Sequence, residues 1–106
     1  MNRGEIWWAD LAAPTGRRPV LLLSRNESYT VRELVIVSPL TTQIRDIPTE
    51  VRLGPEDGVP RVSVVNLDVI NTISKASLQE WITALTVSKM QEVDQAIHFA
   101  LGLEIT

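Results

Sequence analysis

The sequence contains no cysteine and a single histidine among its 106 residues. The absence of cysteine excludes disulfides, thiolate metal sites and cysteine nucleophiles. The histidine, His98, falls beside the apolar stripe of a predicted helix, a position more typical of a surface residue than of a general base. Any catalysis must therefore use arginine, carboxylate and hydroxyl groups.

Other familiar site patterns are missing as well. The aspartates show no metal-ligand spacing, and the chain has no P-loop, GxGxxG or GxSxG motif. No segment approaches the length of a membrane span, and no secretory leader is visible. These absences favour a cytoplasmic protein without membrane contact, metal or cofactor. With 44% apolar residues, we expect residues 1–106 to form a single domain.

The net charge of -3 conceals an uneven distribution of positive groups. Residues 1–61 contain eight arginines and eight acids, whereas residues 62–106 contain two lysines against five acids. The overall charge argues against a general nucleic-acid coat. Any phosphate contacts should therefore be local and few.

Short apolar runs predict six strands, a pattern typical of a small, strongly bent antiparallel sheet or barrel. The expected strands cover residues 3–11, 19–24, 33–39, 48–53, 62–70 and 81–85. Polar or turn-forming residues between them predict connections over 12–17, 41–47, 54–60 and 71–80.

One helix is expected, over Val87–Leu101, with Thr86 as its N-cap and Gly102 at its C-terminal end. Its apolar stripe consists of Met90, Val93, Ile97 and Leu101. The fold class is therefore mainly β with a C-terminal helix.

Two arginines precede a buried apolar run in the stretch 17–24, Arg-Arg-Pro-Val-Leu-Leu-Leu-Ser. Pro19 cannot donate a ladder hydrogen bond, so we expect it at the first residue of a strand, with Arg18 at the rim. A guanidinium binds phosphate through a bidentate fork. Thr41 follows the next buried strand and would share this rim if the two strands pair antiparallel. Spacing alone leaves open a salt-bridged edge arginine and an ordinary turn threonine.

Trp7 and Trp8 are adjacent in the first predicted strand, so their rings should face opposite sides of the sheet. One ring can enter the core. The other must be covered by a loop, a partner or a ligand, and packing is the simpler use.

Several motifs together resemble the MazF/PemK family of bacterial toxin endoribonucleases, nearly from end to end of the chain. They are RGEIW at 3–7, DL at 10–11, RRPVL at 17–21, PLTT at 39–42, SVV at 63–65 with Asp68, VDQA at 93–96 and LGL at 101–103.

The resemblance implies an SH3-like, CcdB/PemK-type β-barrel that forms a homodimer. It also implies the toxin of a type II toxin–antitoxin system, neutralised by a cognate antitoxin. Such toxins are sequence-specific and cleave single-stranded mRNA without metal, leaving a 2′,3′-cyclic phosphate and a 5′-hydroxyl.

By motif position, Arg18 would be the catalytic arginine and Thr41 its hydroxyl partner. We expect RNA contacts from Arg17, Thr42, Glu5, Asn66 and Asp68. Glu5 and Asp68 are also candidates to accept the proton of the 2′-hydroxyl.

The chain departs from many relatives in two places. The connection 12–17 is short, and Val69-Ile70-Asn71 stands where a basic or amide group often follows Asp68. Two alternatives therefore stay open: a non-enzymatic, CcdB-like toxin that binds DNA gyrase, and a catalytically weakened member of the family.

Overall fold

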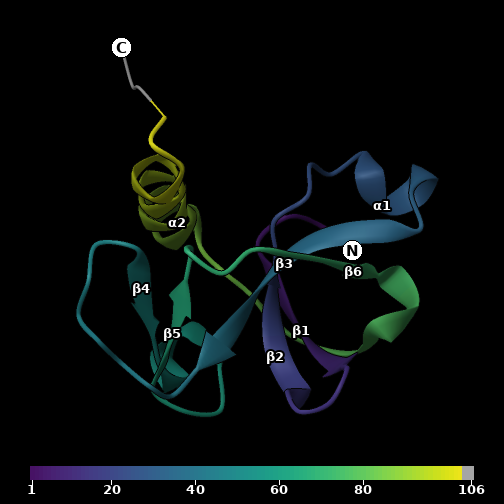
Figure 1. The fold of residues 1–106 in the computed structure, drawn as a ribbon, viewed down its shortest axis with the longest axis horizontal. Coiled ribbons are helices and arrows are strands. Elements are labelled where there is room, and N and C mark those ends of the chain that lie inside the picture. Colours follow the sequence, from purple (N-terminus) through teal and green to yellow (C-terminus); the bar gives the residue numbers. More distant parts are fainter. Residues whose placement is uncertain (104–106) are drawn as a thin grey trace.

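A seven-stranded antiparallel sheet forms the body of the protein in a computed structural model that describes residues 1–103 (Figure 1). The strand order is β4-β5-β3-β2-β1-β7, and β6 pairs with β3 outside this path. The strands are β1 (Glu5–Leu11), β2 (Gly16–Leu22), β3 (Leu34–Thr41), β4 (Glu50–Leu53), β5 (Ser63–Asn66), β6 (Asn71–Ser74) and β7 (Leu78–Ala84). The mainly β, SH3-like fold with a C-terminal helix is confirmed, although the sheet stays open within the described residues.

The C-terminal helix α2 (Val87–Leu101) has the predicted bounds. The hydroxyl of Thr86 accepts a hydrogen bond from the Lys89 N–H at 3.1 Å, and Gly102 ends the helix with a φ of 67°. Helix α2 lies over β4 and β5, and its C-terminal end projects beyond the sheet (Figure 1). Leu101 is consequently exposed rather than part of the buried stripe.

Several other boundaries differ from the prediction. Strand β2 begins at Gly16 because its ladder with β1 continues to the Leu11–Gly16 pair, so Pro19 lies inside the strand. Strand β5 is shorter than predicted, β7 begins earlier, and β6 occupies part of the expected connection 71–80. The short helices α1 (Ser28–Val31), η1 (Pro55–Asp57) and η2 (Lys75–Ser77) were not expected.

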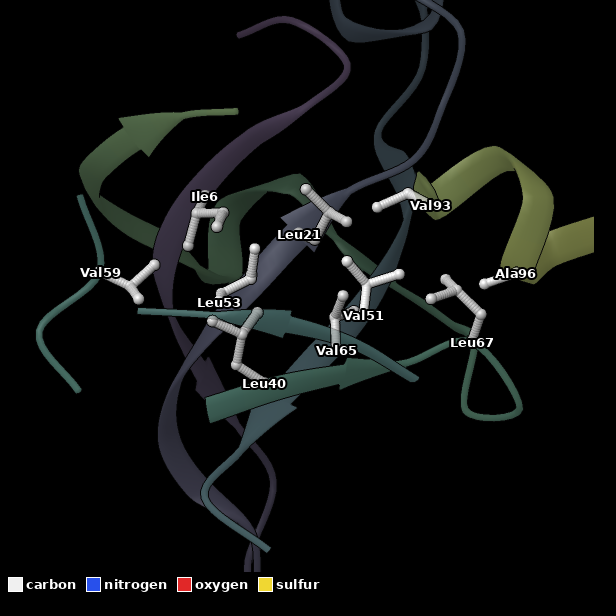
Figure 2. Packing of buried hydrophobic residues seen from close by; sticks show 10 residues of the cluster. All are labelled: Ile6, Leu21, Leu40, Val51, Leu53, Val59, Val65, Leu67, Val93 and Ala96. Carbon is white, nitrogen blue, oxygen red and sulfur yellow. The ribbon is translucent and has the colours of Figure 1, made fainter. Parts of the chain in front are cut away.

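Two clusters of buried side chains lie on opposite faces of the sheet. Leu21 and Leu22 enter different clusters because successive side chains of a strand alternate between faces. Helix α2 covers one cluster, into which it directs Val93 and Ala96 (Figure 2). Helix α1 adds Tyr29 to the other cluster. Strands β2 and β3 therefore have packed side chains on both faces of the sheet.

Strand β3 changes neighbours halfway along its length. One edge pairs with β2 as far as Val20–Pro39, and the other edge pairs first with β6 and then with β5. Pro39 falls at this change, where a missing N–H breaks no ladder. Beyond it, β3 bends away from β2 to lie against β5 (Figure 1). The two strands therefore diverge.

Ser38 fills the gap between the β6 and β5 pairings. Its side chain is fully buried, and its hydroxyl donates to the carbonyls of Val69 at 2.7 Å and Asn66 at 3.1 Å. We expect Ser38→Ala to lower the free energy of unfolding by about 1–3 kcal/mol, because these buried carbonyls lose their donor. Urea denaturation measures this value. Ser88→Ala, at an exposed helix position, should change it by less than about 0.5 kcal/mol. Equal effects of the two changes would contradict this role for Ser38.

Tyr29 is the single tyrosine of the chain, and its phenol donates to the Ser24 carbonyl at 3.1 Å. Burial raises the pKa of Tyr29 to about 12 from the ordinary value of 10.0, because the folded protein disfavours the phenolate. The corresponding stability is present below pH 10 and is lost as the pH rises through about 12. Ultraviolet titration of the folded protein should detect phenolate only near the higher value. The denaturant-unfolded chain should titrate near the lower one, and identical curves would refute the shift.

Candidate active site

Two hollows flank the place where β2 and β3 diverge. The Trp8 hollow has a volume of about 420 Å³, and its lining includes Trp8, Arg17, Thr42, Pro60 and Arg61. The Asn66 hollow has a volume of about 530 Å³, and its lining includes Gln43, Arg45, Glu50, Asn66 and Asn71. Arg18 and Thr41 line both hollows and so stand between them.

Strand divergence explains why Arg18 and Thr41 are accessible together. Arg18 pairs with Ala9 of β1 and lies two residues before Val20, the last residue of β2 that pairs with β3. Thr41 pairs with Val64 of β5. Both side chains are half-buried and stand on strands rather than on loops. The expectation that they share one rim is confirmed.

The two groups are prepared to meet an anion. None of the ion pairs within residues 1–103 involves Arg18, so its guanidinium is available to an anionic ligand. The backbone N–H of Gln43 donates to Thr41 Oγ1 at 3.2 Å. This bond orients the hydroxyl and leaves its hydrogen available to a second oxygen. A guanidinium beside a hydroxyl donor is suited to bind phosphate.

Arg17 is held by the protein itself. Its guanidinium lies 4.4 Å from the centroid of the Trp8 ring, and it reaches Gln79 Oε1 at 2.9 Å and Glu80 Oε2 at 3.4 Å. The rings of Trp7 and Trp8 have different surroundings, as expected for adjacent residues of a strand. Trp7 packs against the core and donates to Glu5 Oε1 at 2.8 Å, whereas the ring of Trp8 lines its hollow beneath Arg17.

The remaining predicted contact residues divide into two groups. Thr42 lines the Trp8 hollow, and Asn66 lines the Asn66 hollow. Glu5 lines neither, because it shares the Trp7 face at the opposite end of β1. Asp68 also lines neither: its carboxylate accepts from Thr49 Oγ1 at 3.0 Å. The structure thus does not bring Glu5 or Asp68 to Arg18.

The loop after Thr41 is fixed by a carboxylate that the sequence did not reveal. Glu50 Oε1 accepts the backbone N–H groups of Arg45 at 3.0 Å and Asp46 at 2.9 Å. Asp46 adopts a positive φ of 55°, and its carboxylate pairs with Arg52 at 3.0 Å. This loop places Arg45 in the Asn66 hollow.

A second loop forms the far wall of the Trp8 hollow. The Thr83 hydroxyl of β7 donates to the Asp57 carbonyl at 3.1 Å, and the Asp57 carboxylate accepts the Gly54 N–H at 2.9 Å. Gly58 follows in the left-handed region with a φ of 93°. These bonds hold the stretch that carries Arg61 to the hollow. Sequence spacing gave no signal for Arg45 or Arg61 beyond the concentration of arginine in residues 1–61.

Within residues 1–103, no group of three histidine, aspartate or glutamate side chains is arranged to hold a metal ion. No helix of that range is long and apolar enough to cross a membrane. At the Arg18–Thr41 pair, the site offers a guanidinium and a hydroxyl group to an anion.

Comparison with known proteins gives consistent similarities. The sequence model of a family described as the PemK-like, MazF-like toxin of type II toxin–antitoxin systems matches residues 2–101. The chain is 39% identical over 100 residues to "Probable endoribonuclease MazF5" of Mycobacterium tuberculosis, covering 93% of this chain and 91% of the relative. It is 36% identical to "Endoribonuclease MazF1" of Mycobacterium bovis, covering 95% and 92%.

Solved structures are similar over comparable lengths. A mycobacterial endoribonuclease in complex with its cognate antitoxin has a TM-score of 0.90 and 33% identity, covering 100% of this chain and 99% of the other. A MazE–MazF complex from Deinococcus radiodurans has a TM-score of 0.81 and 27% identity, covering 98% and 97%.

Gly58→Ala tests how the wall of the Trp8 hollow is held. A Cβ at this position would collide with the Thr83 hydroxyl and would also strain a backbone with a φ of 93°. We expect a loss of about 2–4 kcal/mol in the free energy of unfolding, from both strain and overpacking. Gly16→Ala is the matched control, because its φ is 70° and nothing lies within 4 Å of the added Cβ. It should lose about 1–2 kcal/mol, the backbone strain alone. Equal losses in urea denaturation would show that the Thr83 contact is unimportant.

Proposed function

The chain belongs to the PemK-like, MazF-like family of toxins of type II toxin–antitoxin systems, and we propose that it is an endoribonuclease that cleaves single-stranded mRNA. Arg18 and Thr41 are its catalytic residues. The products are a 2′,3′-cyclic phosphate and a 5′-hydroxyl, and no metal takes part. The observation that carries the proposal is the position of Arg18 and Thr41, which line both hollows where β2 and β3 diverge.

The reaction is an internal transesterification. The ribose 2′-hydroxyl gives its proton to solvent as its oxygen attacks the adjacent phosphorus, the bond from phosphorus to the 5′-oxygen breaks, and that oxygen takes up a proton from solvent as it leaves. Negative charge grows on the non-bridging oxygens as the new bond forms, and the Arg18 guanidinium stabilises that charge. The Thr41 hydroxyl donates to one of these oxygens and aligns the phosphate for in-line attack.

Of the residues predicted to contact RNA, some lie beside the Arg18–Thr41 pair and others do not. Thr42 and Asn66 line the hollows beside the scissile phosphate, and Arg17 presents a guanidinium stacked on Trp8 that RNA can contact. Glu5 and Asp68 line neither hollow, and their carboxylates accept from Trp7 and Thr49, so the proposal does not place them beside the scissile phosphate.

The proposal includes two protein partners. A cognate antitoxin would neutralise the toxin by covering the two hollows, and a similar mycobacterial endoribonuclease forms a complex with its cognate antitoxin. A second copy of the chain would form a homodimer. Exposed apolar side chains, among them Trp81 and Phe99, support such association. The site of action would be the cytoplasm, where mRNA is available.

The gyrase-binding alternative is not favoured, because both relatives described above are named endoribonucleases. The short connection 12–17 still reaches the site, because Ala12 and Thr15 line the Asn66 hollow.

Removal of either catalytic side chain tests the proposal. We expect Arg18→Ala and Thr41→Ala each to lower the cleavage rate by roughly 10²–10³, because each removes one donor that stabilises the transition state. The measurement is cleavage of single-stranded RNA in chelator, with end-group analysis of the products.

Arg25→Ala is the matched control, because Arg25 is exposed and lines neither hollow. It should retain the wild-type rate, and circular dichroism should show that every variant is folded. Undiminished cleavage by folded Arg18→Ala would overturn the assignment. Growth arrest with intact cellular RNA would favour the gyrase-type function. Slow wild-type cleavage that Arg18→Ala nevertheless abolishes would identify a catalytically weakened member.

A further inference from the structure

We propose that Arg61 and Arg45 bind the two RNA phosphates on either side of the scissile one, Arg61 from the Trp8 hollow and Arg45 from the Asn66 hollow. The inference rests on the proposed function, since it takes the Arg18–Thr41 pair as the position of the scissile phosphate. It adds two positioning residues, and it assigns the hollows to opposite directions along the RNA strand.

The two hollows place Arg45 and Arg61 on different sides of the Arg18–Thr41 pair. Arg18 and Thr41 belong to both linings, Arg61 belongs only to the Trp8 hollow, and Arg45 belongs only to the Asn66 hollow. A strand whose scissile phosphate contacts Arg18 and Thr41 must leave through one hollow on its 5′ side and through the other on its 3′ side. Arg45 and Arg61 therefore face different flanking linkages.

The guanidinium groups of Arg45 and Arg61 lie outside the ion pairs of the described residues. The ion pairs of the described chain engage Arg3, Arg17, Arg52 and Lys89. Neither Arg45 nor Arg61 takes part in them, and both are exposed. The one carboxylate in the Asn66 lining, Glu50, directs an oxygen to the backbone N–H groups of Arg45 and Asp46. Each hollow thus offers a guanidinium that no carboxylate of the described residues neutralises.

Hydrogen bonds hold the backbone at both Arg45 and Arg61. Glu50 fixes the N–H of Arg45 at 3.0 Å, and the Arg61 carbonyl accepts the Ser63 hydroxyl at 3.2 Å. The loop before Arg61 is tied to β7 through Thr83 and Asp57. Both arginines therefore begin from held backbone, which reduces the entropy lost when each side chain contacts a phosphate.

The test uses an RNA oligonucleotide that carries a 2′-deoxy nucleotide at the cleavage position, so that it binds without reacting. A neutral methylphosphonate is placed at one linkage at a time, and Kd is measured for wild type, Arg45→Gln and Arg61→Gln. Arg25→Gln is the control, because Arg25 is exposed and lines neither hollow.

We expect each hollow variant to raise Kd about tenfold, as the loss of one charge-assisted contact should. The slope of log Kd against log salt should fall by about 0.7 in each variant, one phosphate contact for single-stranded RNA. A methylphosphonate should weaken wild-type binding at the linkages on both sides of the cleavage position. Each variant should be insensitive to that change at one linkage only, and the two linkages should lie on opposite sides.

Three results would overturn the inference. They are variants that behave like Arg25→Gln, variants insensitive at the same linkage, and variants that keep full sensitivity at both. With the cleavable oligonucleotide, a change in kcat without a change in Kd would be a fourth contradicting result. Failure of the proposed function looks different, because wild-type protein would then not cleave RNA, or folded Arg18→Ala would cleave it normally.

Discussion

The structure depends on one strand that changes partners. Strand β3 pairs with β2 along one edge and with β6 and then β5 along the other, and it bends where the partner changes (Figure 1). Pro39 fits the bend because it has no N–H to leave unpaired, and the buried hydroxyl of Ser38 serves two carbonyls beside it. The same bend parts β3 from β2. The opening that holds Arg18 and Thr41 is thus a direct consequence of how the sheet is built.

Charge is arranged around this opening by selective pairing. Arg17 is paired with Glu80 at 3.4 Å and packed on Trp8, and Arg3 is paired with Asp94 of α2 at 2.7 Å. Arg18 takes part in none of the ion pairs seen in residues 1–103. A chain with a net charge of -3 can therefore bind a polyanion, because what matters is which guanidinium groups stay unpaired near the site.

Local sequence signals predicted some parts of the molecule well. Helix α2 has its expected cap at Thr86 because capping depends on neighbouring residues alone. The common rim of Arg18 and Thr41 followed from the antiparallel pairing of successive strands. Pro19 was misplaced because the β1 ladder extends past it, which no local signal reveals. Arg45 and Arg61 were missed because loop anchors far along the chain, such as Thr83, bring them to the site.

The division of labour between strands and loops follows from these constraints. Arg18 and Thr41 stand on paired strands, where ladder hydrogen bonds limit displacement, and phosphoryl chemistry tolerates little misplacement. The surrounding contacts come from the turn 12–15, closed by a backbone hydrogen bond from Thr15 to Ala12, and from the loops after Thr41 and before Ser63, which side-chain hydrogen bonds hold. A substitution in such a loop can alter which nucleotides bind without moving the reacting groups. Chemistry in this fold should therefore persist while sequence preference changes, because the two properties rest on different classes of structure.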